Sequence, residues 1–136
     1  MSILGVTPVL LVESIEPVTD LWERRLGLPR VATVEHEGRL GFVMYAGEGW
    51  TLMYQSWDSA LADTGAASPD ARRALEAMRG HRQCVFVKVQ DIAAVEKELI
   101  GVPLVMPRRT TFYGSTEIAV QDAAGHLITF AEFKDG

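Results

Sequence analysis

The stretch YGSTEIAVQDAAGHLITFAE, which runs from Tyr113 to Glu132, reads as two strands joined by a tight turn. Ile118 and Val120 alternate with small or polar neighbours on the first side, and residues 127–130 are apolar and partly β-branched on the second. Between them, Asp122-Ala-Ala-Gly125 supplies turn residues, because Asp can bond its own backbone and Gly tolerates positive φ. A lone hairpin is marginally stable in water, so this one must pack against the rest of the chain.

Much of this pattern occurs twice along the chain, and internal repeats indicate how a fold is organised. Three pairs of segments match in the same order: Val12–Val18 with Val89–Val95, Leu26–Pro29 with Ile100–Pro103, and Glu48–Leu52 with Ala124–Ile128. Each copy reads as a strand, a helix and three further strands. The shared order favours an internal duplication over chance similarity.

The composition is that of a globular protein, with 48% apolar and 23% charged residues among 136. No stretch is long and apolar enough for a transmembrane helix, and the first residues lack a signal-peptide pattern. The single cysteine, Cys84, excludes an intramolecular disulfide framework and fits a reducing cytoplasm. A net charge of −5 argues against nucleic acid. We therefore expect a cytoplasmic protein with neither a nucleic-acid nor a membrane partner.

The chain is expected to form one domain over residues 1–136, with a first module at about 5–57, a connection at 58–81 and a second module at about 82–133. In the first module, a strand over Thr7–Val12 precedes a helix with Ser14 as its N-cap. In the connection, Asp58–Ala67 reads as a mobile loop. Ser68 and Pro69 then mark the start of a second helix.

The second module is expected to open with a strand over Cys84–Val89, followed by a short helix that Asp91 caps. Val102–Met106 reads as the next strand, and Pro107–Thr111 as a basic, polar loop. The hairpin from Tyr113 onward then completes the module.

Two such units in tandem resemble the vicinal-oxygen-chelate superfamily, which includes glyoxalase I, extradiol dioxygenases and bleomycin-resistance proteins. The hairpin from Tyr113-Gly114 to Asp122-Ala-Ala-Gly125 is similar to the superfamily's last hairpin, and Thr7–Val12 with Leu21-Trp22 is similar to its opening strand and helix. The resemblance implies an α+β fold. In it, two tandem βαβββ modules form a curved, mostly antiparallel eight-stranded sheet around a cavity, which is the glyoxalase/bleomycin-resistance fold.

Metal-dependent members of this superfamily place one ligand on the first strand and one on the last strand of each module. The resemblance carries these positions onto Thr7, Met53, Cys84 and Thr129. Catalytic divalent sites need carboxylate, imidazole or other hard donors, usually three or more from the protein. None of the four side chains is a carboxylate or an imidazole, so the resemblance implies the fold and the cavity, and we expect no metal and no cofactor.

Other chemistry-bearing residues are few. His36, His81 and His126 are scattered, and each is expected to be a surface or locally bonded histidine. Cys84 begins an apolar strand and is expected to be a small buried residue, although a nucleophilic role would be open to it with an adjacent base. Glu117 is the candidate for acid–base catalysis, because it lies on the strand face opposite Ile118. Glu132, near the C-terminus, is expected to be solvated.

Strand alternation separates a helix-facing set of side chains from a concave set. The helix-facing set comprises Leu10, Val12, Leu52, Tyr54, Val85, Val87, Ile118, Val120, Ile128 and Phe130. In the superfamily the concave face surrounds the pocket. The resemblance then implies a ligand-binding pocket formed by Thr7, Val9, Leu11, Met53, Gln55, Cys84, Phe86, Glu117 and Thr129. Such apolar positions with a few polar groups suit an organic ligand, but they would also suit a filled core without one.

Four aromatic residues lie in expected turns or loops: Trp50, Trp57, Phe112 and Tyr113. They could stack on a ligand, cover the mouth of the pocket or anchor a dimer interface. Because superfamily members usually close their cavities across a two-fold axis, we expect a homodimer.

Three functions remain open from the sequence. The first is a binding protein similar to the bleomycin-resistance group, which holds a small organic molecule without metal or catalysis. The second is a lyase, isomerase or dioxygenase with a non-standard site, for example one that uses Glu117. The third is a structural or regulatory dimer with a collapsed cavity. The sequence favours the first.

Overall fold

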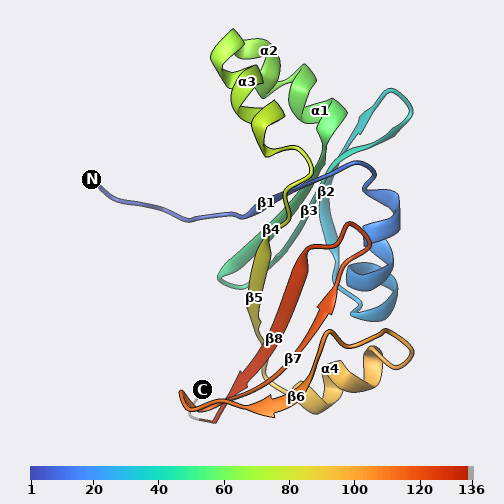
Figure 1. The fold of residues 1–136 in the computed structure, drawn as a ribbon, viewed down its shortest axis with the longest axis vertical. Helices are drawn as coiled ribbons and strands as arrows, with labels where there is room; N and C mark the ends of the chain where they lie inside the picture. The colour runs from blue at the N-terminus through green and yellow to red at the C-terminus, as the bar shows by residue number, and fades with distance from the viewer. Residues whose placement is uncertain (135–136) are drawn as a thin grey trace.

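The computed structural model describes residues 1–134, which form two similar modules and a helical connection between them (Figure 1). The first module contains β1 (Val9–Val12), the short 3-10 helix η1 (Glu16–Val18), the π-helical segment η2 (Asp20–Arg25), β2 (Arg30–His36), β3 (Arg39–Gly47) and β4 (Trp50–Ser56). The connection contains α1 (Trp57–Ala62), α2 (Thr64–Ala67) and α3 (Pro69–Met78). The second module contains β5 (Cys84–Lys88), α4 (Ile92–Glu98), β6 (Met106–Thr110), β7 (Ser115–Gln121) and β8 (Leu127–Phe133).

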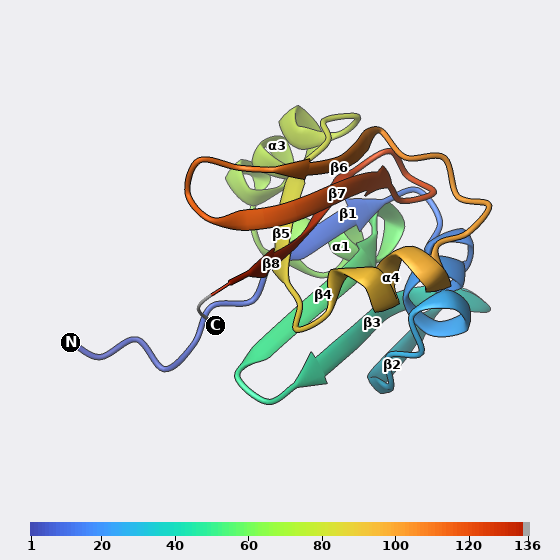
Figure 2. The same cartoon turned by 90° about the horizontal axis from the view of Figure 1, so that it is seen from below.

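The strand order is the same in both modules, which confirms the expected fold class and its duplication. The first sheet has the order β1-β4-β3-β2, and the second has the order β5-β8-β7-β6. In each sheet the first and last strands of the module pair in parallel, and the remaining pairs are antiparallel. The eight strands are thus divided between two four-stranded sheets, with β1 and β5 at their neighbouring edges (Figure 2).

The core lies on the helix-facing sides of both sheets. Side chains from β1, β4, β7 and β8 form one buried cluster with residues of the η1–η2 segment and of α4. Ile118 and Ile128 are fully buried in it, as the alternation predicts. Trp22 of η2 lies between the two modules, with its ring near Tyr45 of β3 and near Phe130 of β8. Because one core serves both sheets, their opposite faces point outward.

A buried polar chain joins the modules through this core. Trp22 Nε1 donates a hydrogen bond of 2.9 Å to the Tyr54 hydroxyl, which in turn donates one of 2.7 Å to Asp122 Oδ2. Asp122 Oδ1 accepts from the backbone N–H groups of Ala124 and His126. The turn of the last hairpin is therefore fixed both locally and against the first module. Gly125, at φ +90°, allows the chain to reverse there.

His126 supplies a second link between the modules. Its ring is buried, and Nδ1 accepts a 2.9 Å hydrogen bond from the backbone N–H of Gln83. Nε2 lies 3.2 Å from the carbonyl oxygen of Leu11 on β1. Because Nδ1 accepts, the ring proton belongs on Nε2, which donates to Leu11. The expectation of a surface or locally bonded histidine is therefore wrong for His126, because its ring is buried and its partners come from segments that are distant in the sequence and meet only in the fold.

The segment after β1 differs from the predicted helix. Ser14 does not cap it; the chain forms a 3-10 turn at Glu16–Val18 and then the π-helical segment η2. Glu16 instead turns its carboxylate to the backbone N–H of Leu40, at 2.9 Å. The first strand also begins at Val9 and not at Thr7. The helix still ends where the sequence predicts, because Gly27 adopts φ +69°.

The connection is helical over a stretch for which the sequence predicts a mobile loop. The Ser56 hydroxyl accepts from the backbone N–H of Ser59 and starts α1. Trp57 and Ala60 bury one side of this helix. Trp57 is therefore a core residue of its own chain and is not free to anchor a dimer. The Ser68 cap of α3 is confirmed, since its hydroxyl accepts from Ala71 N–H at 3.0 Å.

The strand predicted at Val102–Met106 is wrong, and so is the loop predicted at Pro107–Thr111. β6 occupies Met106–Thr110 and pairs with β7 at the edge of the second sheet. A register shift between Met106 and Arg109 accommodates Pro107, which lacks the N–H for a regular ladder. Among residues 1–134, none of the helices has the length and apolar character that a membrane-spanning helix requires.

Candidate functional site

Each sheet has one face that is turned away from the shared core, and these two open faces carry eight of the nine predicted pocket residues, all except Thr7, which precedes β1. Strand register defines them, because residues paired across neighbouring strands share a face. The open face of the first sheet, here the first open face, consists of Val9, Leu11, Ala32, Val34, Phe42, Met44, Ala46, Thr51, Met53 and Gln55. The second open face consists of Cys84, Phe86, Lys88, Met106, Arg109, Ser115, Glu117, Ala119, Gln121, Leu127, Thr129, Ala131 and Phe133.

The two open faces differ in chemistry. None of the ten residues named for the first face is charged, and its middle is formed by Met44 and Met53 beside Phe42. The second carries aromatic rings together with Lys88 and Arg109. The alternation thus places Cys84 and the pocket residues Phe86, Glu117 and Thr129 on one side of the second sheet, opposite the buried core.

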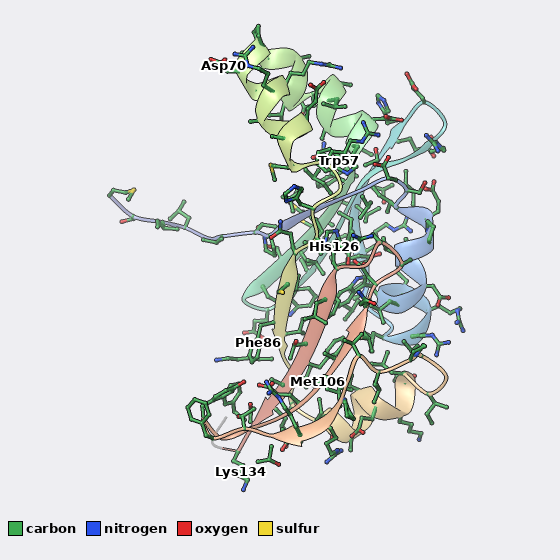
Figure 3. The ribbon with its side chains drawn as sticks, in the orientation of Figure 1. Trp57, Asp70, Phe86, Met106, His126 and Lys134 are labelled. Atoms are coloured by element: carbon green, nitrogen blue, oxygen red, sulfur yellow. The ribbon has the colours of Figure 1, made fainter. Side chains whose placement is uncertain are left out.

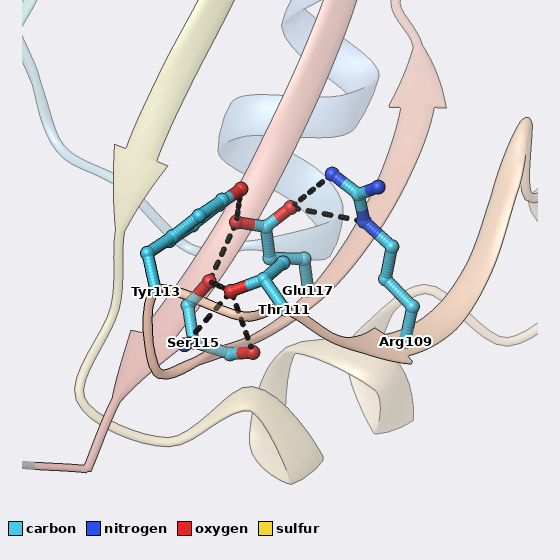
Figure 4. Close-up of polar contacts among 5 residues, drawn as sticks. All are labelled: Arg109, Thr111, Tyr113, Ser115 and Glu117. Atoms are coloured by element: carbon cyan, nitrogen blue, oxygen red, sulfur yellow. Dashed lines mark hydrogen bonds and ion pairs between the residues drawn. The ribbon is translucent and has the colours of Figure 1, made fainter.

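Glu117 lies at the centre of a polar cluster on the second open face (Figure 4). Its side chain is fully buried, and Oε1 accepts hydrogen bonds of 3.3 and 2.9 Å from Nε and Nη2 of Arg109. Oε2 accepts 2.7 Å hydrogen bonds from the hydroxyls of Tyr113 and Ser115. Thr111 bonds Ser115 through both its hydroxyl and its backbone, which fixes the turn between β6 and β7.

The hydrogen bonds determine the charge of Glu117. Burial alone would raise the pKa of its carboxyl, but the bonds from Tyr113, Ser115 and Arg109 outweigh burial and hold the pKa below its usual value. Glu117 is therefore ionised at neutral pH, and four donors occupy its two oxygens. Such a carboxylate positions Arg109 and Tyr113 well, but it is poorly suited to taking a proton from a substrate.

The four positions at which metal-dependent relatives bind their ion lie on the open faces or at their ends. The Thr7 hydroxyl is hydrogen-bonded to that of Thr51, and Met53 lies in the next row of the first sheet. Cys84 and Thr129 occupy neighbouring rows of the second sheet. Two hydroxyls, a thioether and a thiol do not form the hard donor set that a divalent ion needs. Among residues 1–134, no three His, Cys, Asp or Glu side chains gather as a metal site would require.

A separate cavity of about 320 Å3 lies at the seam between β1 and β5. It includes Val9, Leu11 and Cys84 of the predicted pocket, together with Trp57 and His126. Figure 3 places Trp57 and His126 near this seam, with Phe86 farther along β5. The cavity does not include Thr7, Met53, Gln55, Phe86, Glu117 or Thr129. One chain therefore does not bring the nine predicted residues around a single cavity.

Two predictions about single residues need correction. Cys84 is exposed and not buried, because β5 is an edge strand with an open face on one side. Glu132 is not simply solvated: its carboxylate accepts a 2.8 Å hydrogen bond from the backbone N–H of Ile92 and so helps to start α4. Gln55 contacts Ser59 of α1 at 3.3 Å, so the helical connection limits how it can turn toward a ligand.

Sequence reasoning missed several residues of the second open face, among them Lys88, Arg109 and Phe133. The signal for two of them was present, because the period-two alternation through Phe86 and Ala131 continues to Lys88 and Phe133. Arg109 was missed because its segment carries no apolar alternation that would predict a strand. Tyr113 was noted as a possible stacking residue, and its ring lies 6.3 Å from that of Phe133.

Comparison with solved structures places this architecture among similar folds. TioX from Micromonospora sp. ML1 is 15% identical, with a TM-score of 0.69 over 95% of this chain and 98% of that one. TnmS3, an antibiotic binding protein from Streptomyces sp. CB03234, is 17% identical, with a TM-score of 0.70 over 98% and 99%. A lactoylglutathione lyase from Agrobacterium tumefaciens is 13% identical, with a TM-score of 0.69 over 97% and 94%. At these identities the likeness concerns the fold alone.

Sequence comparison identifies the family directly. None of the curated proteins matches the chain. The family model of the Glyoxalase/Bleomycin resistance protein/Dioxygenase superfamily matches residues 6–130, which is nearly the whole chain. This protein therefore belongs to the glyoxalase/bleomycin resistance protein/dioxygenase superfamily.

Proposed function

We propose that this protein binds a small organic molecule between the two open faces of a homodimer, without a metal ion and without catalysis. In the proposed arrangement, the first open face of one copy faces the second open face of its partner. A two-fold axis creates two such sites. The exposed single cysteine, Cys84, suits a protein that works in the reducing cytoplasm.

The observation that carries this proposal is the exposure of large apolar side chains on both faces. Phe86 is 50% exposed on the second face, and Val9 is 43% exposed on the first. Val34, which also belongs to the first face, is 55% exposed, and a gathering of exposed apolar side chains on one sheet face is typical of a binding site or an interface. Each face combines apolar bodies with a few polar groups, which is the usual lining of an organic-ligand pocket.

A second copy is needed because one chain cannot enclose the ligand. Both open faces point away from the shared core, and only Val9, Leu11 and Cys84 of the nine predicted pocket residues meet around one cavity within a chain. Trp50 and Phe112, which are both exposed at turns beside these faces, could anchor the rim of an interface. The buried Trp57 takes no part in this role.

Binding is favoured over catalysis by the chemistry of the candidate groups. The carboxylate of Glu117 is saturated by hydrogen bonds, and the four positions used by metal-dependent relatives carry Thr7, Met53, Cys84 and Thr129. One of the solved structures of similar fold is described as antibiotic-binding, and another as a lyase, so the neighbours support a binding role without deciding it.

Two measurements test this function. Sedimentation of the native protein should give the mass of a dimer, which is twice the 15.0 kDa mass of one chain. The uncharged fluorescent probe N-phenyl-1-naphthylamine should bind saturably and raise the melting temperature. Replacing Phe86 or Met53 by Ala, one on each face, should weaken binding about tenfold, because each large apolar side chain contributes roughly 1.5–3 kcal/mol when buried. Ile100→Ala, which changes an exposed apolar residue outside both faces, is the matched control.

A monomer at micromolar concentration, with no saturable probe binding, would contradict the proposal. Equal effects of Phe86→Ala and Ile100→Ala would also contradict it, because the probe would then bind away from the open faces.

A further inference from the structure

The second open face carries a strip of three aromatic rings in the order Phe86, Phe133, Tyr113. The ring centroids of Phe86 and Phe133 are 6.2 Å apart, and those of Phe133 and Tyr113 are 6.3 Å apart. Both distances lie in the range of favourable aromatic contacts. Phe86 and Tyr113 remain about half exposed, so the strip presents ring surface to whatever lies over it. The ring planes are inclined by 57° and 35°, so a flat molecule can lie face to face on one ring and against the edges of its neighbours.

The position of Tyr113 in this strip is fixed by the polar cluster beneath it. Its hydroxyl is tied to Glu117 at 2.7 Å, and Glu117 is held in turn by Arg109 and Ser115. Glu117 is thus a positioning residue for the strip. A prearranged aromatic surface loses little conformational entropy on binding, which favours a rigid, planar ligand.

The strip is bordered by a positive charge that has no ion-pair partner within residues 1–134. Lys88 Nζ lies 5.1 Å from the ring centroid of Phe133, and no described carboxylate forms an ion pair with it. The other charged groups in the rows of this face are Arg109 and Glu117, which neutralise each other through their ion pair. Among the described residues of these rows, Lys88 therefore leaves a net charge of one positive unit, although the whole chain is acidic.

We propose that the ligand is a planar aromatic anion, such as an aromatic carboxylate, sulfonate or phenolate. Its rings stack on the strip of Phe86, Phe133 and Tyr113, and its anionic group lies at Lys88. This inference rests on the proposed binding function and specifies the ligand class for the same site. The uncharged first open face of the partner covers the other side of the rings, so the anionic group can be paired only at the Lys88 side.

A matched pair of fluorescent probes isolates the contribution of the anionic group. 8-Anilinonaphthalene-1-sulfonate and N-phenyl-1-naphthylamine share one ring system, and only the first carries a sulfonate. We expect the sulfonate to bind the native protein about fivefold more tightly than the uncharged probe, which is the upper range for a partly exposed ion pair. Because the pairing is electrostatic, this preference should shrink as salt is added.

Three variants locate the effect. Lys88→Gln should remove most of the preference for the sulfonate while leaving the affinity for the uncharged probe unchanged. Phe86→Ala should lower the affinity for both probes by the same factor, because it removes aromatic surface on which their rings lie. Lys97→Gln changes an exposed lysine of α4, on the other side of the sheet, and should alter neither affinity. Thermal unfolding of each variant verifies that it is folded.

The possible outcomes separate this inference from the function on which it rests. If both probes bind with equal affinity and Phe86→Ala weakens both, the binding function stands and the anionic ligand class is overturned. The anionic ligand class is also overturned if Lys88→Gln and Lys97→Gln behave alike. If neither probe binds saturably, or if Phe86→Ala has no effect, the proposed site itself fails.

Discussion

Tyr54 on β4 donates a 2.7 Å hydrogen bond to Asp122 in the turn of the last hairpin, and this contact joins two residues from different modules. Both side chains are buried, and the Trp22 indole N–H bonds the same hydroxyl. Burial, together with the neighbouring Asp122, raises the pKa of Tyr54 far above its usual value, so the hydroxyl stays neutral and keeps its proton for Asp122. The two modules thus share a polar contact inside one apolar core.

Tyr54→Phe should destabilise the protein by about 2 kcal/mol in urea unfolding. The change leaves Asp122 Oδ2 without its donor and Trp22 Nε1 without its acceptor, and buried polar groups without partners are costly. Tyr45→Phe is the matched control. It also removes one hydroxyl from a buried tyrosine, but Glu23 keeps its bonds from Arg30, so the loss should be smaller. If both variants lose the same unfolding free energy, the contact between the modules stabilises the protein no more than the hydroxyl of Tyr45 does.

The buried carboxylate of Glu117 should make stability depend on acid pH. Since its folded-state pKa is lowered, it stabilises the protein fully above the unfolded-state pKa of about 4.3. That contribution is lost as the pH falls through the lower folded-state pKa. Glu117→Gln should lower the free energy of unfolding by about 2 kcal/mol at pH 7, because the charge-assisted hydrogen bonds are lost. The difference in unfolding free energy between the variant and the native protein should become smaller toward pH 3.

Urea unfolding of both proteins between pH 7 and pH 3 measures this difference. Glu35→Gln, which changes an exposed glutamate on β2, provides the control and should leave stability nearly unchanged throughout. If the difference in unfolding free energy between Glu117→Gln and the native protein stays constant with pH, the carboxylate is not held ionised by its neighbours.

The N-cap of α4 offers a local test of the second module. The Asp91 carboxylate accepts from the backbone N–H groups of Ala93 and Ala94. Asp91→Ala should therefore cost about 1 kcal/mol. Asp63 stands at the start of α2 without making a side-chain cap bond, so Asp63→Ala should cost much less. Urea unfolding compares the two, and similar losses would remove the support for a capping role of Asp91.

The sequence predicted most of the fold because the decisive signals are local. Alternation placed Ile118 and Ile128 in the core, and caps such as Ser68 and Asp91 marked helix starts that the structure confirms. β6 was missed because its polar residues carry no apolar alternation. Its place depends on pairing with β7 and on the ion pair between Arg109 and Glu117, which are separated in sequence and meet only in the folded sheet.

The candidate site was less predictable for a related reason. Which strand face a residue occupies follows from its own neighbours, so Phe86 and Thr129 could be assigned to one face of the sheet. Whether that face is covered depends on how the modules pack. Cys84 was expected to be buried but is exposed, because the shared core takes the opposite faces of both sheets. The seam cavity, with Trp57 and His126 in its lining, likewise arises only from packing.

Metal content provides the sharpest test of the site. Protein purified without chelator should contain far less than one divalent ion per chain, and added nickel or zinc should leave its melting temperature unchanged. The physical reason is the donor set of Thr7, Met53, Cys84 and Thr129, in which only the thiol of Cys84 can become an anionic ligand. Methylglyoxal–glutathione turnover, which needs polarisation of the substrate oxygens, should be absent with either metal. A lactoylglutathione lyase assayed in parallel provides the positive control. Near-stoichiometric metal that disappears in Thr7→Ala or Thr129→Ala would refute this prediction, and so would metal-stimulated turnover that is abolished in Glu117→Gln.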